Sequence, residues 1–317
     1  MTTQRFPLGL GCMGMSGMYG QTDDATSIAT IHAAIERGVT LLDTGDFYGH
    51  GHNEMLIGRA IADRRDKVQL SVKFGALRSP DGAFIGLDTR PAAVKNFLAY
   101  SLKRLGVDVI DVYRPARLDP NVPIEDTIGA IADLVKQGHV RQIGLSEVGP
   151  DTIRRAHAVH PIADLQIEYA LVSRDPEDKI FPLLDELGIS ATLYGVLSRG
   201  LLGGSKPTDG DYRSHLPRFA AANRQTNDRI VTSVRELATR TGRTPGQVAI
   251  GWVLAKRPTF MPVIGARTQA QLIDALGALD HPLTAAEVSE LETLVPRGAI
   301  AGTRYDARQM QALDSER

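Results

Sequence analysis

The stretch VTLLDTGDFYG (39–49) decides the fold, because it joins a short apolar run to residues that can carry chemistry. The run VTLLD has the length and aliphatic content of a buried strand, and it ends at Asp43. Tyr48 follows in the adjoining loop. The next apolar run, VQLSVK (68–73), also ends at a charged residue, Lys73. Successive strands that end in charge predict a site at the strand ends of a parallel sheet.

Short apolar runs of this kind alternate with helical patterns along the whole chain. Strands that are separated by helices need right-handed parallel crossovers, and a closed barrel accommodates many of them without a second domain. No GxGxxG follows the first strand, which disfavours an open dinucleotide-binding sheet. We therefore predict an α/β fold, the (β/α)8 TIM barrel. Its strands are expected at 8–12, 39–43, 68–73, 107–114, 140–146, 163–168, 189–195 and 260–266.

Capping residues mark three of the predicted helices. The pattern at 23–38 has Thr22 or Asp23 as its N-cap and Gly38 just past its end. The pattern at 89–106 has Pro91 in its first turn. The pattern at 124–138 has one apolar face and ends at Gly138. We expect one domain over 1–317, with long loops at 74–90 and 199–225 on the active face and a C-terminal tail at 298–317.

The composition excludes several classes of protein. The net charge is −1 and the basic residues are scattered, so nothing indicates a nucleic-acid partner. The single cysteine, Cys12, rules out an internal disulfide and fits a reducing compartment. No apolar run is long enough to span a membrane, and the N-terminal residues do not resemble a signal peptide. We expect a soluble cytoplasmic protein with a small-molecule substrate and no membrane partner; the sequence leaves the oligomeric state open.

The residue types at the strand ends suggest a reaction. Hydride reduction of a carbonyl needs a proton donor, and a tyrosine is a poor acid near neutral pH unless its phenolate is stabilised. The Lys73 ammonium would provide that stabilisation, and Asp43 would keep the lysine charged and oriented. Tyr48 would donate the proton in reduction and accept it in oxidation. The hydride itself must come from a cofactor, because no side chain can supply one.

The chain as a whole resembles the aldo-keto reductases. The resemblance rests on the segments GDFYGHGHNEMLIGRA (45–60), DPNVPIEDTIGAIADLVKQGHVRQIGLSE (119–147) and LQIEYALVSRDPE (165–177) in combination. It implies that Asp43, Tyr48 and Lys73 are the catalytic set, that the cofactor is NADP(H), and that the substrate is a carbonyl compound or an alcohol. Arg267 favours NADP(H) over NAD(H), because a guanidinium matches a phosphate.

The resemblance also assigns the cofactor contacts. The nicotinamide would lie against the segment at 12–14 and Asp43, with its carboxamide held by two polar side chains and its ring stacked on Tyr194. The segment at 195–200 would surround the pyrophosphate, and residues near the last strand would surround the adenosine 2′-phosphate. The implied residues are Cys12, Met13, Gly14, Asp43, Ser146, Gln166, Tyr194, Gly195, Val196, Leu197, Ser198, Arg199, Gly200, Gly265, Arg267, Gln271 and Asp274. No spacing of residues indicates a metal site.

The sequence departs from the family pattern at several of these positions. Glu147 stands where an asparagine or arginine is common, LYGVLSRG (193–200) replaces the usual YSPLGRG, and Ala275 replaces an asparagine. The largest departure is in DVIDVYRPARLDPNVPIEDT (108–127), where Ala116 occupies the place of the histidine that orients the substrate carbonyl. Losing such a donor raises the activation free energy by about 2.7–4 kcal/mol, which slows a reaction without abolishing it.

Arg114 is the candidate substitute for the missing histidine. It lies two residues before Ala116, so it should face the same side of the strand and place a guanidinium near the carbonyl. The alternative is that Arg114 serves the structure by pairing with an acid such as Asp43 or Glu168. Arg117 should face away from Ala116, and we expect a structural role for it.

Three functions remain open from the sequence. The first is an NADP(H)-dependent oxidoreductase. The second is a cofactor-binding sensor or regulatory subunit with vestigial turnover, since the histidine is absent. The third, a barrel lyase or isomerase that uses Lys73 as a Schiff-base amine, is disfavoured by Tyr48 and by the cofactor-like C-terminal segment. The lone Trp252, in VAIGWVLAK (248–256), is predicted to be a core residue.

Overall fold

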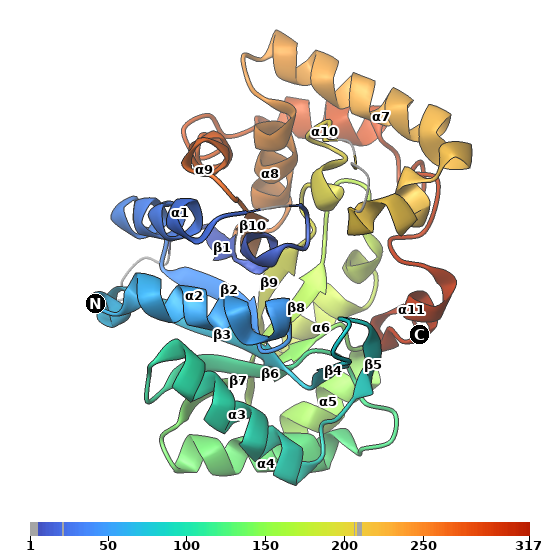
Figure 1. The fold of residues 1–317 in the computed structure, drawn as a ribbon. Helices are drawn as coiled ribbons and strands as arrows, with labels where there is room; N and C mark the ends of the chain where they lie inside the picture. Colours follow the sequence, from blue (N-terminus) through green and yellow to red (C-terminus); the bar gives the residue numbers. More distant parts are fainter. Residues whose placement is uncertain (1–5, 21, 206, 208–210) are drawn as a thin grey trace.

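The structure is a computed structural model that describes residues 6–20, 22–205, 207 and 211–317. Eight parallel strands close into a barrel in chain order, with the first strand paired to the last (Figure 1). The predicted (β/α)8 barrel is confirmed. Its strands are β1 (Gly9–Gly11), β2 (Leu41–Gly45), β3 (Gln69–Phe74), β6 (Ile110–Pro115), β7 (Val140–Ser146), β8 (Ile162–Glu168), β9 (Ser190–Tyr194) and β10 (Met261–Gly265).

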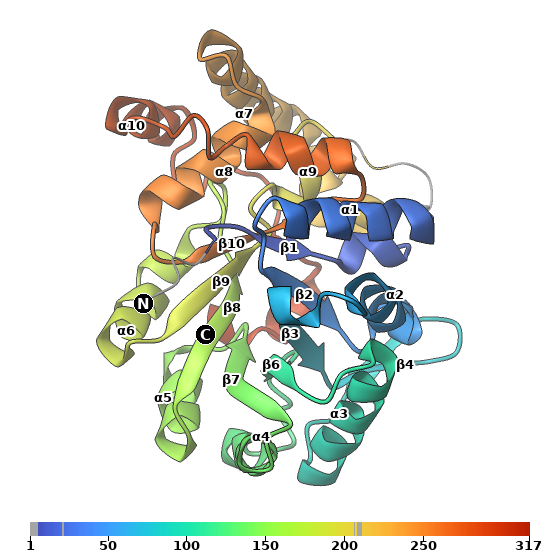
Figure 2. The same ribbon diagram turned by 90° about the vertical axis from the view of Figure 1, so that its left-hand side faces the viewer.

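The helices surround the strands on the outside of the barrel (Figure 2). The Asp23 side chain caps the first of them by accepting a hydrogen bond from the Thr26 N–H at 2.7 Å. Gly138 ends a later helix with a φ of +82°, which only glycine adopts freely. The helices are α1 (Asp24–Glu36), α2 (His52–Ile61), α3 (Pro91–Leu105), α4 (Ile124–Lys136), α5 (Pro150–Val159), α6 (Ile180–Leu187), α7 (Ala221–Arg240), α8 (Pro245–Lys256), α9 (Gln269–Leu276), α10 (Ala285–Leu294) and α11 (Ala307–Gln311).

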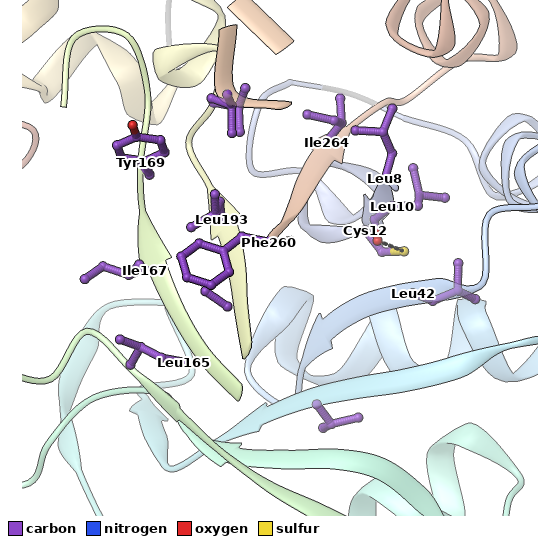
Figure 3. Packing of buried hydrophobic residues seen from close by; sticks show 14 of the residues in the cluster. Leu8, Leu10, Cys12, Leu42, Leu165, Ile167, Tyr169, Leu193, Phe260 and Ile264 are labelled. Carbon is purple, nitrogen blue, oxygen red and sulfur yellow. Dashed lines mark hydrogen bonds between the residues drawn. The ribbon is translucent and has the colours of Figure 1, made fainter. Parts of the chain in front are cut away.

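The main hydrophobic core lies between the strands and the helices. Figure 3 shows part of this layer, with Leu42, Leu165 and Leu193 projecting from β2, β8 and β9. Trp252 of α8 is fully buried, as the sequence predicts, and its Nε1 donates to Glu292 at 3.2 Å. Burial of these side chains stabilises the barrel from outside and leaves its interior to other residues.

The interior of the barrel changes from apolar to charged along the strands. Leu41 of β2 joins Met261 and Val263 of β10 in a small apolar cluster that is separate from the main core. Asp43 is the next residue of β2 on the same face of the strand. The charged groups therefore collect toward the C-terminal ends of the strands, where barrels carry their sites.

Two additions lie on the same side of the barrel, at the right of Figure 1. Within the loop at 74–90, which we predicted to be irregular, β4 (Ala76–Arg78) and β5 (Phe84–Leu87) form an antiparallel hairpin. The C-terminal tail carries α11. The loop at 199–225 is described in part and contains short 3-10 turns before α7 begins. In the described part of the chain, every helix is too short or too polar to cross a membrane.

Candidate active site

Asp43 and Lys73 form an ion pair at the ends of the neighbouring strands β2 and β3. The Lys73 Nζ donates to Asp43 Oδ1 at 2.5 Å, and both side chains are buried. The second carboxylate oxygen, Oδ2, accepts from Ser71 Oγ at 2.9 Å and from Gln166 Nε2 at 2.7 Å. These bonds fix the carboxylate, so the lysine has a single position beside it. The structure therefore brings together the two charged residues that the sequence predicted.

Tyr48 lies over this ion pair. It begins the 3-10 turn η2 (Tyr48–Gly51), and the centroid of its ring is 5.3 Å from Lys73 Nζ. Burial raises the pKa of Tyr48 well above its ordinary value, Asp43 adds to the rise, and the positive charge of Arg117 opposes it. Among the residues that the structure describes, none hydrogen-bonds the Tyr48 hydroxyl. The hydroxyl can therefore serve a bound molecule.

Lys73 is exposed to two opposing effects. Burial lowers its pKa below the ordinary lysine value, while the contact with Asp43 works in the opposite direction. The charges of Arg114 and Arg117 add to the lowering. The Lys73 ammonium thus lies near two other cations and next to Tyr48, whose phenolate form its charge would stabilise.

Arg114 occupies the inside of the barrel and is fully buried. Its Nη1 donates to Asp164 Oδ1 at 2.5 Å and its Nη2 to Ser71 Oγ at 3.0 Å. Thr192 Oγ1 and the Leu145 carbonyl also accept from Nη1, at 3.3 and 3.4 Å. This geometry favours the structural alternative, with Asp164 as the acid in place of Asp43 or Glu168. These contacts tie the guanidinium to the interior network, and none of them is to Tyr48.

Arg117 was expected to face away from Ala116 and to serve the structure, and this stays a prediction. Strand β6 ends at Pro115, so the alternation of strand faces no longer applies two residues later. The Arg117 Nη1 donates to the Ala116 carbonyl at 2.6 Å and to Ser146 Oγ at 3.3 Å. Its Nη2 donates to the Tyr305 hydroxyl at 3.4 Å. The Arg117 guanidinium therefore contacts the backbone at position 116, the place of the missing histidine, and links it to the end of β7.

Comparisons with known proteins agree on one family. The model of the aldo/keto reductase family matches residues 7–296. A probable aldo-keto reductase 1 from Glycine max is 40% identical over 305 residues, which cover 94% of this chain and 88% of that protein. The chain belongs to the aldo/keto reductase family. The prediction of an oxidoreductase of this family is confirmed.

Solved structures of the family share the fold. The glycerol dehydrogenase of Gluconobacter oxydans has a TM-score of 0.84 and 29% identity, covering 93% of this chain and 92% of that one. The holo form of an aldo-keto reductase from Bacillus halodurans has a TM-score of 0.77 and 28% identity, covering 91% and 92%. The Klebsiella pneumoniae aldo-keto reductase in complex with NADPH has a TM-score of 0.75, 24% identity and 95% coverage of both chains.

The residues implied for the nicotinamide lie close together in this aldo/keto reductase. Ser146 ends β7, Gln166 lies in β8, and Tyr194 ends β9. Gln166 contacts Asp43, and the Tyr194 hydroxyl donates to Glu147 Oε1 at 2.7 Å. The Cys12 side chain is fully buried and its Sγ faces the Leu10 carbonyl. Its N–H donates to the Asp43 carbonyl at 2.9 Å and its carbonyl accepts from Asn53 Nδ2 at 2.8 Å, so its backbone polar groups are engaged as well. Met13 is partly exposed and Gly14 is buried beside it.

The segment at 195–200, which the resemblance assigns to the pyrophosphate, is a tight turn. Gly195, Ser198, Arg199 and Gly200 all have positive φ angles, from 47° to 90°. A Cβ on Gly195 would lie 2.9 Å from the Glu168 side chain, so glycine is required there. The Ser198 and Gly200 N–H groups donate to carbonyls within the same segment, at 2.6 and 2.9 Å, and so hold the turn in this shape.

The predicted adenosine site lies at the end of β10 and the start of α9. Gly265 and Gln271 are exposed, and Arg267 is partly exposed. The Arg267 Nη1 donates to the Tyr19 carbonyl at 2.7 Å, and within the described residues no carboxylate pairs with this guanidinium. Asp274 accepts from Thr244 Oγ1 at 3.3 Å and from Gln247, so it joins α9 to the N-terminus of α8.

Sequence reasoning missed the C-terminal tail as part of the site. Arg304 forms an ion pair with Glu147 through both guanidinium ends, Nη1 to Oε1 at 2.9 Å and Nη2 to Oε2 at 2.6 Å. The Tyr305 hydroxyl lies 3.0 Å from that of Tyr194. Burial would raise the pKa of Glu147, but Arg304 overrides this effect and holds it well below the usual range. The unusual acid at position 147 was the one signal that a cation must lie nearby.

Proposed function

We propose that this protein is an NADP(H)-dependent oxidoreductase that interconverts a carbonyl and an alcohol, with Tyr48 as proton donor and acceptor. The buried Asp43–Lys73 pair under the Tyr48 ring carries the proposal. Family membership gives the reaction class, and these three residues give the proton path. The substrate is a small-molecule carbonyl compound, an aldehyde or ketone, or the corresponding alcohol.

The proton is best supplied by a phenol in this environment. Burial keeps Tyr48 protonated at neutral pH, because it raises the pKa of the phenol. The cost of forming the phenolate during reduction is lowered by the nearby cations Lys73 and Arg117. In oxidation the same phenolate takes the proton back from the alcohol.

The residues at the ends of β9 and β10 fit NADP(H). Arg267 is partly exposed and carries no paired carboxylate within the described residues, so its guanidinium is open to a 2′-phosphate. The turn at 195–200, where the resemblance places the pyrophosphate, is held in a fixed shape by its own backbone hydrogen bonds. Ser146 and Gln166 offer a hydroxyl and an amide to the carboxamide. When bound, the cofactor supplies or accepts the hydride.

Turnover with NADPH tests the proposal. Purified protein is incubated with NADPH or NADH and a panel of aldehydes and ketones, and cofactor absorbance is followed. We expect oxidation of NADPH, faster than that of NADH, and a loss of about 100-fold or more in kcat for Tyr48→Phe. Tyr100→Phe, at an exposed tyrosine, is the matched control.

Cofactor binding is measured separately by the change in nicotinamide fluorescence. Tyr48→Phe should bind NADPH as the parent protein does, because only the proton donor is lost. A variant that keeps a tenth of the parent rate would show that Tyr48 is not the acid. Tight NADPH binding without turnover on any substrate would instead support a sensor or regulatory subunit.

A further inference from the structure

The open end of the barrel holds a cluster of guanidinium groups, and Arg117 differs from the rest. Arg199 donates to Glu168 at 2.9 Å, and Arg218 lies 3.4 Å from the same carboxylate. Arg304 is paired with Glu147. In the part of the chain that the structure describes, Arg117 alone of these four has no carboxylate within ion-pair distance. Among the described residues Arg117 therefore has no direct ion pair, and only the more distant charge of Glu147, which Arg304 already holds, acts on it.

Two of the N–H donors of Arg117 also remain open. The Ala116 carbonyl and Ser146 Oγ accept from Nη1, and the Tyr305 hydroxyl accepts from Nη2. This leaves the Nε–H and the second N–H of Nη2 without an acceptor among the described residues. Donors on these two neighbouring nitrogens form the fork that matches the two oxygens of a carboxylate.

Arg117 lies near the residues proposed to transfer the proton. The Ala116 N–H donates to the Phe74 carbonyl at 2.8 Å, so the chain before Arg117 lies beside the residue that follows Lys73. Ser146, which Arg117 contacts, ends the neighbouring strand β7. The charge of Arg117 acts on both Tyr48 and Lys73. A group bound by this guanidinium would thus lie next to a carbonyl held at Tyr48.

We infer that Arg117 binds a carboxylate of the substrate, and that the preferred substrates are 2-oxo acids or, in oxidation, 2-hydroxy acids. The inference rests on the proposed function and names its substrate class. A carboxylate fits better than a phosphate, because the other three guanidinium groups are already engaged and the open fork has two donors. The methyl group of Ala116 offers no hydrogen-bond donor that would compete for the same oxygen atoms.

The test compares a charged substrate with a neutral one of the same shape. Steady-state rates with NADPH are measured for pyruvate and for pyruvamide. We expect the parent protein to prefer pyruvate by at least about tenfold in kcat/KM. In Arg117→Gln, kcat/KM for pyruvate should fall about 100-fold, with a marked rise in KM. For pyruvamide kcat/KM should fall about tenfold or less, and through kcat alone, because Tyr48 loses a nearby cation. Arg117→Lys should lie between the two, because it keeps the charge and loses the fork.

The control is Arg90→Gln, at an exposed arginine that pairs with Asp88 at the end of the loop at 74–90. It should leave both substrates unaffected. Thermal unfolding of each variant establishes that the fold is retained. An equal fall in kcat/KM for pyruvate and pyruvamide would mean that Arg117 acts only at the reacting carbonyl, and the inference would be overturned. It would also be overturned if the parent protein showed no preference for pyruvate.

Binding of oxamate separates this inference from the proposed function. Oxamate carries the carboxylate of pyruvate and cannot be reduced, so calorimetry with NADP⁺ present needs no turnover. Binding to the parent protein, with a loss of about tenfold or more in Arg117→Gln, supports carboxylate recognition even if no substrate is turned over. Equal binding of oxamate and oxamide by the parent protein would refute it.

Discussion

The two sides of the barrel's open end hold buried carboxylates with opposite pKa shifts. On the side of β2, burial raises the pKa of Asp46 to about 7, and it raises that of Glu54 as well. On the side of β7 and β8, burial acts in the same direction, but the pKa values of Glu147 and Glu168 are lowered. Burial alone therefore does not decide the charge of a carboxyl group.

The number of guanidinium groups accounts for the difference. Arg304 contacts Glu147, and Arg199 and Arg218 contact Glu168. Asp46 and Glu54 share Arg104, which donates to Glu54 Oε2 at 2.7 Å and to the backbone carbonyl of Asp46. On the β2 side, Asp46 therefore changes its protonation near neutral pH. On the β7–β8 side, Glu147 and Glu168 stay ionised in ion pairs, and the pair with Arg304 anchors the tail.

Removing the Arg304 guanidinium from the tail should lower the free energy of unfolding more than any other change proposed for these ion pairs. Arg304→Met leaves Glu147 buried without its main partner and also breaks the contact with Glu316. Loss of one partner of a buried ion pair costs about 3–5 kcal/mol, so we expect the free energy of unfolding to fall by that amount. Urea denaturation measures it.

Arg240→Met is the matched control for this prediction, because its pair with Glu290 is solvent-exposed. Its effect should stay below about 1 kcal/mol. The double variant Arg304→Met/Glu147→Gln should recover part of the loss, since it removes the uncompensated charge. A change in Arg304→Met as small as in the control would show that the tail does not depend on this pair.

The fold was predictable from the sequence because its signals are local. Each barrel strand is a short apolar run with turn residues around it, and each helix has its own cap or apolar face. Asp43, Lys73, Ser146 and Tyr194 were placed correctly for the same reason, since each terminates or nearly terminates a strand. The hairpin inside the loop at 74–90 was missed, because its two strands are too short to show alternation.

The charged partners were not predictable in this way. Glu147 and Arg304 are far apart in the sequence, and nothing local indicates that the tail returns to β7. Arg114 and Arg117 were assigned from strand alternation, which applies only within β6, and β6 ends at Pro115. Pairing between charged side chains depends on how distant segments pack, and a single sequence does not contain that information in readable form.

Inside the barrel a buried carboxylate, Asp164, depends on one guanidinium, that of Arg114. A substitution of Arg114 tests how much this pair stabilises the fold. Arg114 is the buried partner of Asp164, whose Oδ2 has no hydrogen bond within the described residues. We expect Arg114→Met to lower the free energy of unfolding by about 3 kcal/mol, because Asp164 loses its counter-charge. Arg114→Met/Asp164→Leu should restore most of this loss. If Arg114→Met is instead fully stable but has lost catalysis, Arg114 replaces the histidine as first predicted from the sequence.

The smallest expected effect concerns Asp46 and appears as a dependence on pH. Between the ordinary aspartate pKa and about 7, the folded protein keeps a proton on Asp46 that the unfolded chain has lost. The folded state therefore loses stability as pH rises through this window, the reverse of what the lowered pKa of Glu147 produces in acid.

Asp46→Asn removes the effect, so its free energy of unfolding should vary less between pH 4.5 and 7.5. One pKa unit corresponds to about 1.4 kcal/mol, and we expect the variant to gain at least about this much over the parent protein across the window. Asp133→Asn, at a half-exposed surface pair, should follow the parent curve. If the curves of Asp46→Asn and the parent protein run parallel, Asp46 is ionised throughout, and the two sides of the barrel end do not differ in the way described.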